Sequence, residues 1–310
     1  MPKMVSFAHT QVHASLGDSL FKVAIKGPAM SVYSPAQIAQ FVLIPTVAWP
    51  TVFLVGNCCI CLVSIIISLH KGYISTYVAS AVNTAVIFAV FTPMHDAAHG
   101  SVATSRFAFI NAVVGNLAAA CFPLPYPAFK HLHLLHHKHT NEELDPDLWA
   151  GTGPSFLLPL RWFSIEYKYY TSYLPKLHLR PRGEAIWTIV SLTAMIALIV
   201  TLCRSGHGTV VFYGWLLPGR LAIGLLAYFF DYLPHRPHKI SKKADPYKAT
   251  SVTSLIGENT WLLTWPLLHQ NYHNIHHLAP YIPFYQYSTV WHKLKPELLE
   301  RGTKIKPILQ

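Results

Sequence analysis

Long apolar stretches alternate with polar segments along the chain and predict most of its helices. The stretches that reach the length of a membrane span, about 20 apolar residues, lie at 41–69, 73–94, 185–203 and 208–233. Only residues 70–72 separate the first two, and only residues 204–207 the last two, so each pair predicts a helical hairpin. We therefore predict an all-α integral-membrane protein with about four transmembrane helices in two hairpins.

Three weaker apolar segments lie at residues 107–125, 156–173 and 252–268. The first is expected to dip into the membrane and return or to lie in the interface, and the other two are expected to lie in the interface. Prolines and asparagines break the first segment, and only 33 residues lie between His99 and His133 on its two sides. If these two histidines bind one metal centre, they lie on the same membrane face, and two crossings between them would need about 40 residues in helix alone. The other two segments contain several Trp or Tyr residues, which gather at membrane interfaces.

The composition agrees with a membrane protein. Apolar residues make up 52% of the 310 residues and charged residues 12%, against roughly 25% charged residues in soluble domains. No linker, repeat or charge block divides the chain. We interpret residues 41–310 as a single membrane domain that carries a cytoplasmic helical cap and follows a cytoplasmic N-terminal segment, residues 1–40.

The distribution of charge predicts which side of the membrane the chain termini occupy. The net charge of +11 comes from 24 Lys and Arg against 13 Asp and Glu, and no basic stretch interleaved with aromatic residues indicates a nucleic-acid partner. With four crossings, all of these cations except Lys71, Arg204 and Arg220 fall on the side of the termini. Because Lys and Arg stay on the cytoplasmic side, we expect that side to face the cytoplasm or stroma, in the endoplasmic reticulum or another internal membrane.

Histidines gather in three clusters on this same side. The clusters are His95 and His99; His133, His136 and His137; and His273, His276 and His277. Spacings of three and four place the histidines of each cluster on one face of a helix. Neutral imidazole binds iron, zinc, copper or nickel, but eight donors are too many for one tetrahedral zinc. The clusters therefore predict two metal ions with open positions for a reacting molecule.

Other polar side chains near the clusters are expected to support the ligands. A ligating histidine normally donates its second N–H to a carboxylate, carbonyl or water, and the residues placed for this are Asp96, Asp145, Asp147 and Asn274. The sequence Asp145-Pro-Asp147 fits a capping turn equally well. The same supporting role is predicted for the histidines that lie off the repeating spacing, which are His131, His139 and His269.

The chain resembles the membrane fatty acid desaturase and hydroxylase superfamily over residues 91–283, in the order of the motifs H-D-A-A-H, H-L-L-H-H-K-H-T-N-E-E-L-D-P-D and N-Y-H-N-I-H-H-L-A-P. The resemblance implies a non-haem di-iron centre, held mainly by histidine, that activates dioxygen and oxidises an unactivated C–H bond. It also implies a further ligand before the third motif, where the chain reads D-Y-L-P-H-R-P-H. His235 is then the ninth ligand, with His238 as the alternative, and Asp231 binds iron or holds a metal-bound water. No catalytic residue beyond the metal centre is predicted.

The resemblance implies desaturation or hydroxylation of a long apolar lipid drawn from the bilayer, with a fatty acyl chain as the first candidate. A carotenoid ring hydroxylase or ketolase is the alternative, because D-Y-L-P-H-R-P-H and the following Q-N-Y-H-N-I-H-H-L-A-P-Y-I-P-F-Y are similar to that branch. A metal-binding membrane protein without catalytic activity is the second alternative. The sequence has no H-P-G-G haem motif, dinucleotide fingerprint or iron–sulfur cysteine cluster. Electrons are therefore expected from a separate carrier, either a cytochrome b-type haem protein or a ferredoxin.

Overall fold

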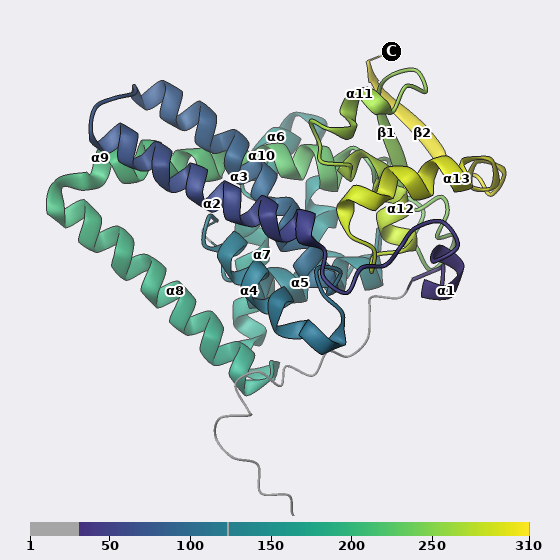
Figure 1. Cartoon of the computed structure of the whole chain (residues 1–310), viewed down its shortest axis with the longest axis horizontal. Helices are drawn as coiled ribbons and strands as arrows, with labels where there is room; N and C mark the ends of the chain where they lie inside the picture. Colours follow the sequence, from purple (N-terminus) through teal and green to yellow (C-terminus); the bar gives the residue numbers. More distant parts are fainter. Residues whose placement is uncertain (1–30, 123, 310) are drawn as a thin grey trace, which may run out of the picture.

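The computed structural model describes residues 31–122 and 124–309, and most of these are helical (Figure 1). Residues 1–30, most of the predicted N-terminal segment, lie outside the described residues. The α-helices are α1 (Pro35–Ile38), α2 (Trp49–His70), α3 (Thr76–His99), α4 (Ala108–Ala119), α5 (Tyr126–His139), α6 (Leu158–Trp162), α7 (Ile165–Tyr173), α8 (Arg182–Leu202), α9 (Gly208–Val211), α10 (Leu217–Leu226), α11 (Trp261–Thr264), α12 (His273–Leu278) and α13 (Tyr287–Glu300). The strands are β1 (Ser251–Ile256) and β2 (Lys304–Leu309).

Three stretches of helix in the described residues are long and apolar enough to cross a membrane: α2, α3 and the continuous stretch Arg182–Tyr232. Helices α2 and α3 pack against each other as a hairpin (Figure 1). Within the third stretch, Gly206 has a left-handed φ of 85°. There the chain turns back after α8 and continues through α9 and α10 (Figure 1). The third stretch therefore consists of two arms joined at Gly206.

The first two long helices differ in their ends from the apolar runs that predict them. Helix α2 begins only at Trp49, with Pro50 in its first turn, where proline fits because it lacks an N–H and fixes φ. Helix α3 continues past residue 94 to His99, and Gly100 caps it in the left-handed conformation. This extension places both histidines of the first cluster in the last turns of α3.

The expectation of an all-α fold is wrong in one region. Strands β1 and β2 form a parallel two-stranded sheet, in which Ser251 pairs with Lys304 and Ile256 with Leu309. Strand β1 occupies the start of the segment 252–268, whose Trp content predicts only an interfacial location. Parallel strands need a long crossover connection, and the chain from α11 to α13 supplies it. This connection carries the third histidine cluster, in α12.

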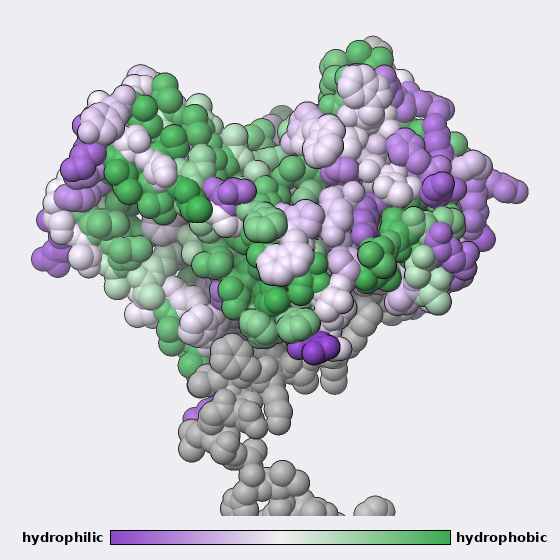
Figure 2. All heavy atoms as spheres, viewed as in Figure 1, coloured by the Kyte–Doolittle hydropathy of each residue, from purple (hydrophilic) through white to green (hydrophobic). Residues whose placement is uncertain are grey.

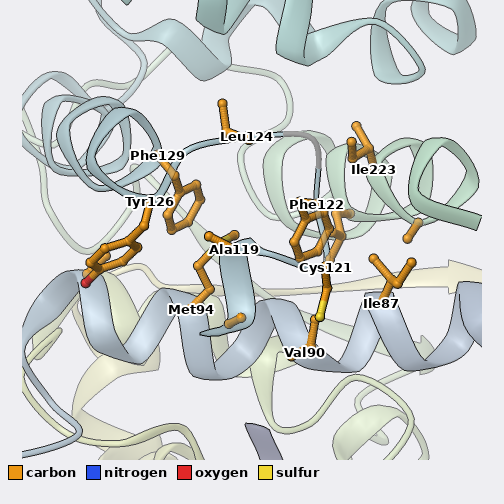
Figure 3. Close-up of a cluster of buried hydrophobic side chains, with 14 of the residues drawn as sticks. Ile87, Val90, Met94, Ala119, Cys121, Phe122, Leu124, Tyr126, Phe129 and Ile223 are labelled. Carbon is orange, nitrogen blue, oxygen red and sulfur yellow. The ribbon is translucent and has the colours of Figure 1, made fainter. Parts of the chain in front are cut away.

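Apolar side chains are distributed differently over the two sides of the molecule. Many face outward on the helical arms, as do Phe53 in α2 (63% exposed) and Ile196 in α8 (56% exposed), and hydrophilic residues gather instead around β1, β2 and α13 (Figure 2). Inside, side chains of α3, α5 and α10 such as Met94, Phe129 and Ile223 belong to one cluster of buried apolar residues (Figure 3). The outward apolar surface suits a lipid environment, since soluble proteins rarely expose such large patches.

Candidate metal centre

Nine histidines that lie far apart in the sequence meet in two groups. The first group contains five residues, His95 and His99 of α3, His133 and His137 of α5, and His276 of α12. The second group contains four residues, His136 of α5, His235, and His273 and His277 of α12. In each group, one ring nitrogen of every member lies within 4.8 Å of the others. All nine of the predicted histidine ligands are therefore brought together, in two places.

The imidazole rings meet through their Nε2 atoms. In the first group, Nε2 of His276 lies 2.9 Å from that of His95 and 2.7 Å from that of His137. In the second group, Nε2 of His273 lies 2.9 Å from that of His235 and 3.0 Å from that of His277. Two nitrogens bound at right angles to one metal ion are about 3 Å apart when each metal–nitrogen bond is about 2.1 Å. The separations fit neighbouring ligands of a shared ion.

The protonation state of the rings also suits a metal. A neutral ring has one N–H, so Nε2 of His276 cannot satisfy two facing nitrogens by hydrogen bonding alone. Burial lowers the pKa well below the ordinary histidine value for six members outside the membrane-spanning segments, which are His133, His137, His235, His273, His276 and His277. The neutral base is the form that binds metal. The buried donor set therefore fits two borderline or soft metal ions such as iron.

His136 differs from the other members because two carboxylates face it. Its Nδ1 lies 2.8 Å from Oδ1 of Asp145 and 3.4 Å from Oδ2 of Asp147. Burial opposes protonation, but these carboxylates raise the pKa of His136 overall. Asp145 also accepts hydrogen bonds from the backbone N–H of Asn141 and of Asp147. Asp145 therefore has both of the roles predicted for the Asp-Pro-Asp sequence. It is a partner of His136, and it caps a turn.

Two further side chains contact the histidines, although no sequence motif predicts this role for them. The hydroxyl of Tyr287 lies 3.1 Å from Nδ1 of His276. The hydroxyl of Thr140 lies 3.5 Å from Nδ1 of His277. Each contact occupies the ring nitrogen that faces away from its group, and so fixes which nitrogen points inward. The position of Thr140 directly after the second cluster is the one available sequence signal.

Asp96 and Asn274 lie beside histidines but bind mainly other groups. Asp96 accepts hydrogen bonds from the Thr51 hydroxyl (3.1 Å) and the backbone N–H of Phe284 (3.2 Å), and its nearest distance to Nδ1 of His95 is 3.9 Å. The Asn274 amide donates to the carbonyl of Thr250 (3.3 Å). These side chains hold α3 and α12 against neighbouring segments, which is a more indirect support than the predicted contact with a ligand.

Five other candidates do not join either histidine group among the described residues. His131 contacts the ring of Tyr173, His139 pairs with Glu142 at 3.0 Å, and His269 lies 2.9 Å from the Ser288 hydroxyl.

The remaining two of the five belong to the segment before the third cluster. Nε2 of His238 lies 3.3 Å from the backbone carbonyl of Asp231, and the His238 ring stacks on His235 with ring centres 6.1 Å apart. The side chain of Asp231 lines a neighbouring cavity. Of the three candidates in this segment, His235 joins a histidine group, and His238 and Asp231 do not.

A cavity of about 60 Å³ opens beside both groups. Its wall includes His95 and His133 of the first group and His136 and His273 of the second. Apolar side chains form most of the remainder, several of them visible in Figure 3: Met94, Phe122, Leu124, Phe129 and Ile223. An apolar molecule held there would lie against histidines of both groups.

Comparison with known families identifies the chain. A family model for fatty acid desaturase matches residues 73–308. The chain belongs to the fatty acid desaturase family. The resemblance in the motifs is thereby confirmed, and the matched residues of this desaturase-family protein include all nine converging histidines.

Curated relatives of this desaturase-family protein fall into two kinds. A beta-carotene ketolase of Paracoccus sp. (strain PC1) is 29% identical over 199 residues, which cover 64% of this chain and 71% of the relative. A fatty acid desaturase of Bacillus subtilis (strain 168) is 23% identical over 250 residues, covering 71% and 68%. The omega-3 fatty acid desaturase, endoplasmic reticulum, of Nicotiana tabacum is 26% identical over 249 residues, covering 70% and 64%. The protein is an oxidoreductase of this family.

Proposed function

We propose that this chain is a membrane-bound non-haem di-iron oxidoreductase that uses dioxygen and external electrons to oxidise an unactivated C–H bond of a long apolar lipid. The observation that carries the proposal is the convergence of buried histidines into groups of five and four beside an apolar cavity. Family membership weakens the alternative of a metal-binding protein without catalytic activity.

In this proposal each histidine group holds one iron, and together the two irons supply the activation of dioxygen. Asp145 and Asp147 fix the tautomer of His136, so that its Nε2 faces the second group. The apolar wall of the cavity excludes water and orients the substrate carbon beside the histidines. The protein's contribution is therefore binding, orientation and a dry site.

We propose further that the chain crosses the membrane four times, with the bend at Gly206 dividing the third apolar stretch into two crossings. The stacking of His70, at the end of α2, on His207, just after the bend, supports this proposal, with ring centres 5.0 Å apart. The tips of the two hairpins then lie together at one membrane face, and the histidine groups lie toward the other face. The excess of Lys and Arg supports assigning that other face to the cytoplasm or stroma.

Two substrate classes are supported by different observations. A fatty acyl chain agrees with the family and with the relatives named as fatty acid desaturases. A carotenoid ring agrees with the relative named as a beta-carotene ketolase, which has the highest identity of the three relatives described. The electrons come, in this proposal, from a separate carrier of the cytochrome b or ferredoxin type.

Metal analysis and expression test the proposal. The purified protein is expected to contain about two irons per chain, one for each group, and zinc alone or less than one iron would contradict it. Expression in a host that accumulates carotenoids, with pigments and fatty acids profiled together, decides the substrate class. The His136→Ala variant is the control for host enzymes. Unchanged profiles in both classes, with two irons bound and a working carrier, would overturn the proposed activity.

A further inference from the structure

The cavity beside the metal centre contains polar side chains that an unsubstituted hydrocarbon substrate does not need. Glu166 of α7 and Gln270, in the turn before α12, belong to its wall. Glu166 is 8% exposed and Gln270 2% exposed. Burying such groups costs free energy unless a hydrogen-bond partner meets them. A polar group on a molecule bound in the cavity would supply such a partner.

Glu166 offers a hydrogen-bond acceptor to the cavity. One carboxylate oxygen, Oε1, pairs with Arg220, whose Nη1 also donates to the backbone carbonyl of Phe163 at 2.7 Å. The other oxygen, Oε2, is buried and has no partner. Arg220 thus pairs with one oxygen of the carboxylate and leaves the other without a donor.

Gln270 offers the complementary group. Its amide nitrogen Nε2 is buried and likewise has no partner. The two residues belong to the same cavity wall, which therefore contains one unpaired acceptor and one unpaired donor. A hydroxyl group can satisfy either of them, because it donates one hydrogen bond and accepts two.

Other ligands fit this wall less well. Carboxyl groups of Asp147 and Asp231 also line the cavity, and its wall contains no lysine or arginine, so a carboxylate or phosphate end of a lipid would find no such cation to pair with there. Neither Glu166 nor Asp231 belongs to a described group of side chains that converge closely enough to hold a metal ion. A neutral donor on an otherwise apolar molecule is the chemistry that remains.

We infer that Glu166 and Gln270 bind a hydroxyl group of the substrate, and that the preferred substrate is a long apolar lipid already hydroxylated close to the carbon that is oxidised. This inference rests on the proposed function. Because the hydroxyl is bound before and during the reaction alike, its contacts act mainly on the KM of the substrate and leave kcat nearly unchanged.

Matched substrates test the inference. Initial rates of the purified protein, with its electron carrier, are compared for β-carotene and zeaxanthin, and for stearoyl lipids and a positional series of monohydroxystearoyl lipids. In one of these pairs we expect kcat/KM to be about 10- to 100-fold higher for a hydroxylated member, the range for a hydrogen bond to a charged group. Glu166→Leu should remove the preference through KM, and Gln270→Leu should reduce it.

Glu184→Gln is the matched control, because Glu184 also pairs with an arginine, Arg180, at 2.7 Å, but lies outside the cavity wall. Glu184→Gln should keep the preference for the hydroxylated substrate. Every variant should keep the iron content of the native protein. Equal rates for the hydroxylated and plain members, or an equal fall for both in Glu166→Leu, would overturn the inference while leaving the proposed function intact. No oxidation of any member by the iron-loaded protein would overturn both.

Discussion

The two histidine groups use the same side chain but are built differently. The first has five members and the second four. The hydroxyl of Tyr287 is the partner of His276 in the first group, whereas the carboxylates of Asp145 and Asp147 face His136 in the second. A carboxylate raises the basicity of the histidine it contacts more than a neutral hydroxyl does. Two ions bound there would therefore have unequal surroundings, and substitutions should affect the two groups unequally.

Removal of one ligand from each group is the strongest test of this difference. His136→Ala leaves the second group with three histidines, and His99→Ala leaves the first with four. We expect His136→Ala to retain about one iron per chain and to lose more than about 100-fold in turnover, since even partners outside the ligand shell cost 10- to 100-fold. His99→Ala should retain more iron. Two irons with normal turnover in His136→Ala would refute its assignment as a ligand.

The two roles of Asp145 can be separated by substitution. Asparagine caps a turn as well as aspartate does, but its NH2 group cannot accept the hydrogen bond that Oδ2 takes from the Asn141 N–H. Asp145→Asn should therefore lose about 1 kcal/mol of stability and lower iron affinity or activity by about 10- to 100-fold. Asp145→Ala should lose the cap as well, at a cost of about 1 kcal/mol in the free energy of unfolding. Iron titration and thermal unfolding of both variants measure the two effects. Identical iron affinities for Asp145→Asn and the native protein would show that the carboxylate does not act on His136.

A smaller effect is expected in the first group. Tyr287→Phe removes the hydroxyl from Nδ1 of His276 and leaves that buried nitrogen unpaired. We expect iron affinity to fall by about two- to tenfold, the range for a neutral hydrogen bond. Tyr285→Phe is the matched control, since Tyr285 belongs to the same segment but not to either histidine group. A loss as large as that of Asp145→Asn would contradict the inequality of the groups.

The sequence predicts which histidines converge but not how they divide. Spacings of three and four correctly place each cluster on a helix, yet His136 belongs to a different group from His133 and His137. Successive residues of a helix differ by about 100° in direction, so His136 and His137 cannot point to the same ion. The pairs at a spacing of four stay together, as His133 and His137 do, and as His273 and His277 do. This division depends on how the helices face each other, which no single cluster reveals.

Local patterns also fail where distant segments pair. The alternation of residues 251–256 is too short to predict a strand next to a Trp-containing apolar segment, and its partner, residues 304–309, lies beyond the third cluster. His235 likewise has no neighbour at helical spacing within a cluster, and only the resemblance of D-Y-L-P-H-R-P-H points to it. The contacts of Tyr287 and Glu166 depend on tertiary packing alone.

The smallest effect is expected at a histidine of the dense run that belongs to neither group. His139 pairs with Glu142 at 3.0 Å, and both side chains are partly exposed (18% and 32%). Because an exposed ion pair contributes about 0.2–1 kcal/mol at most, His139→Ala should shift the free energy of unfolding by no more than that and should keep both irons and full turnover. His137→Ala, two residues away, should lose iron from the first group, because His137 faces His276 at 2.7 Å. Equal iron loss in the two variants would mean that density of histidines, and not their direction on the helix, determines the metal centre.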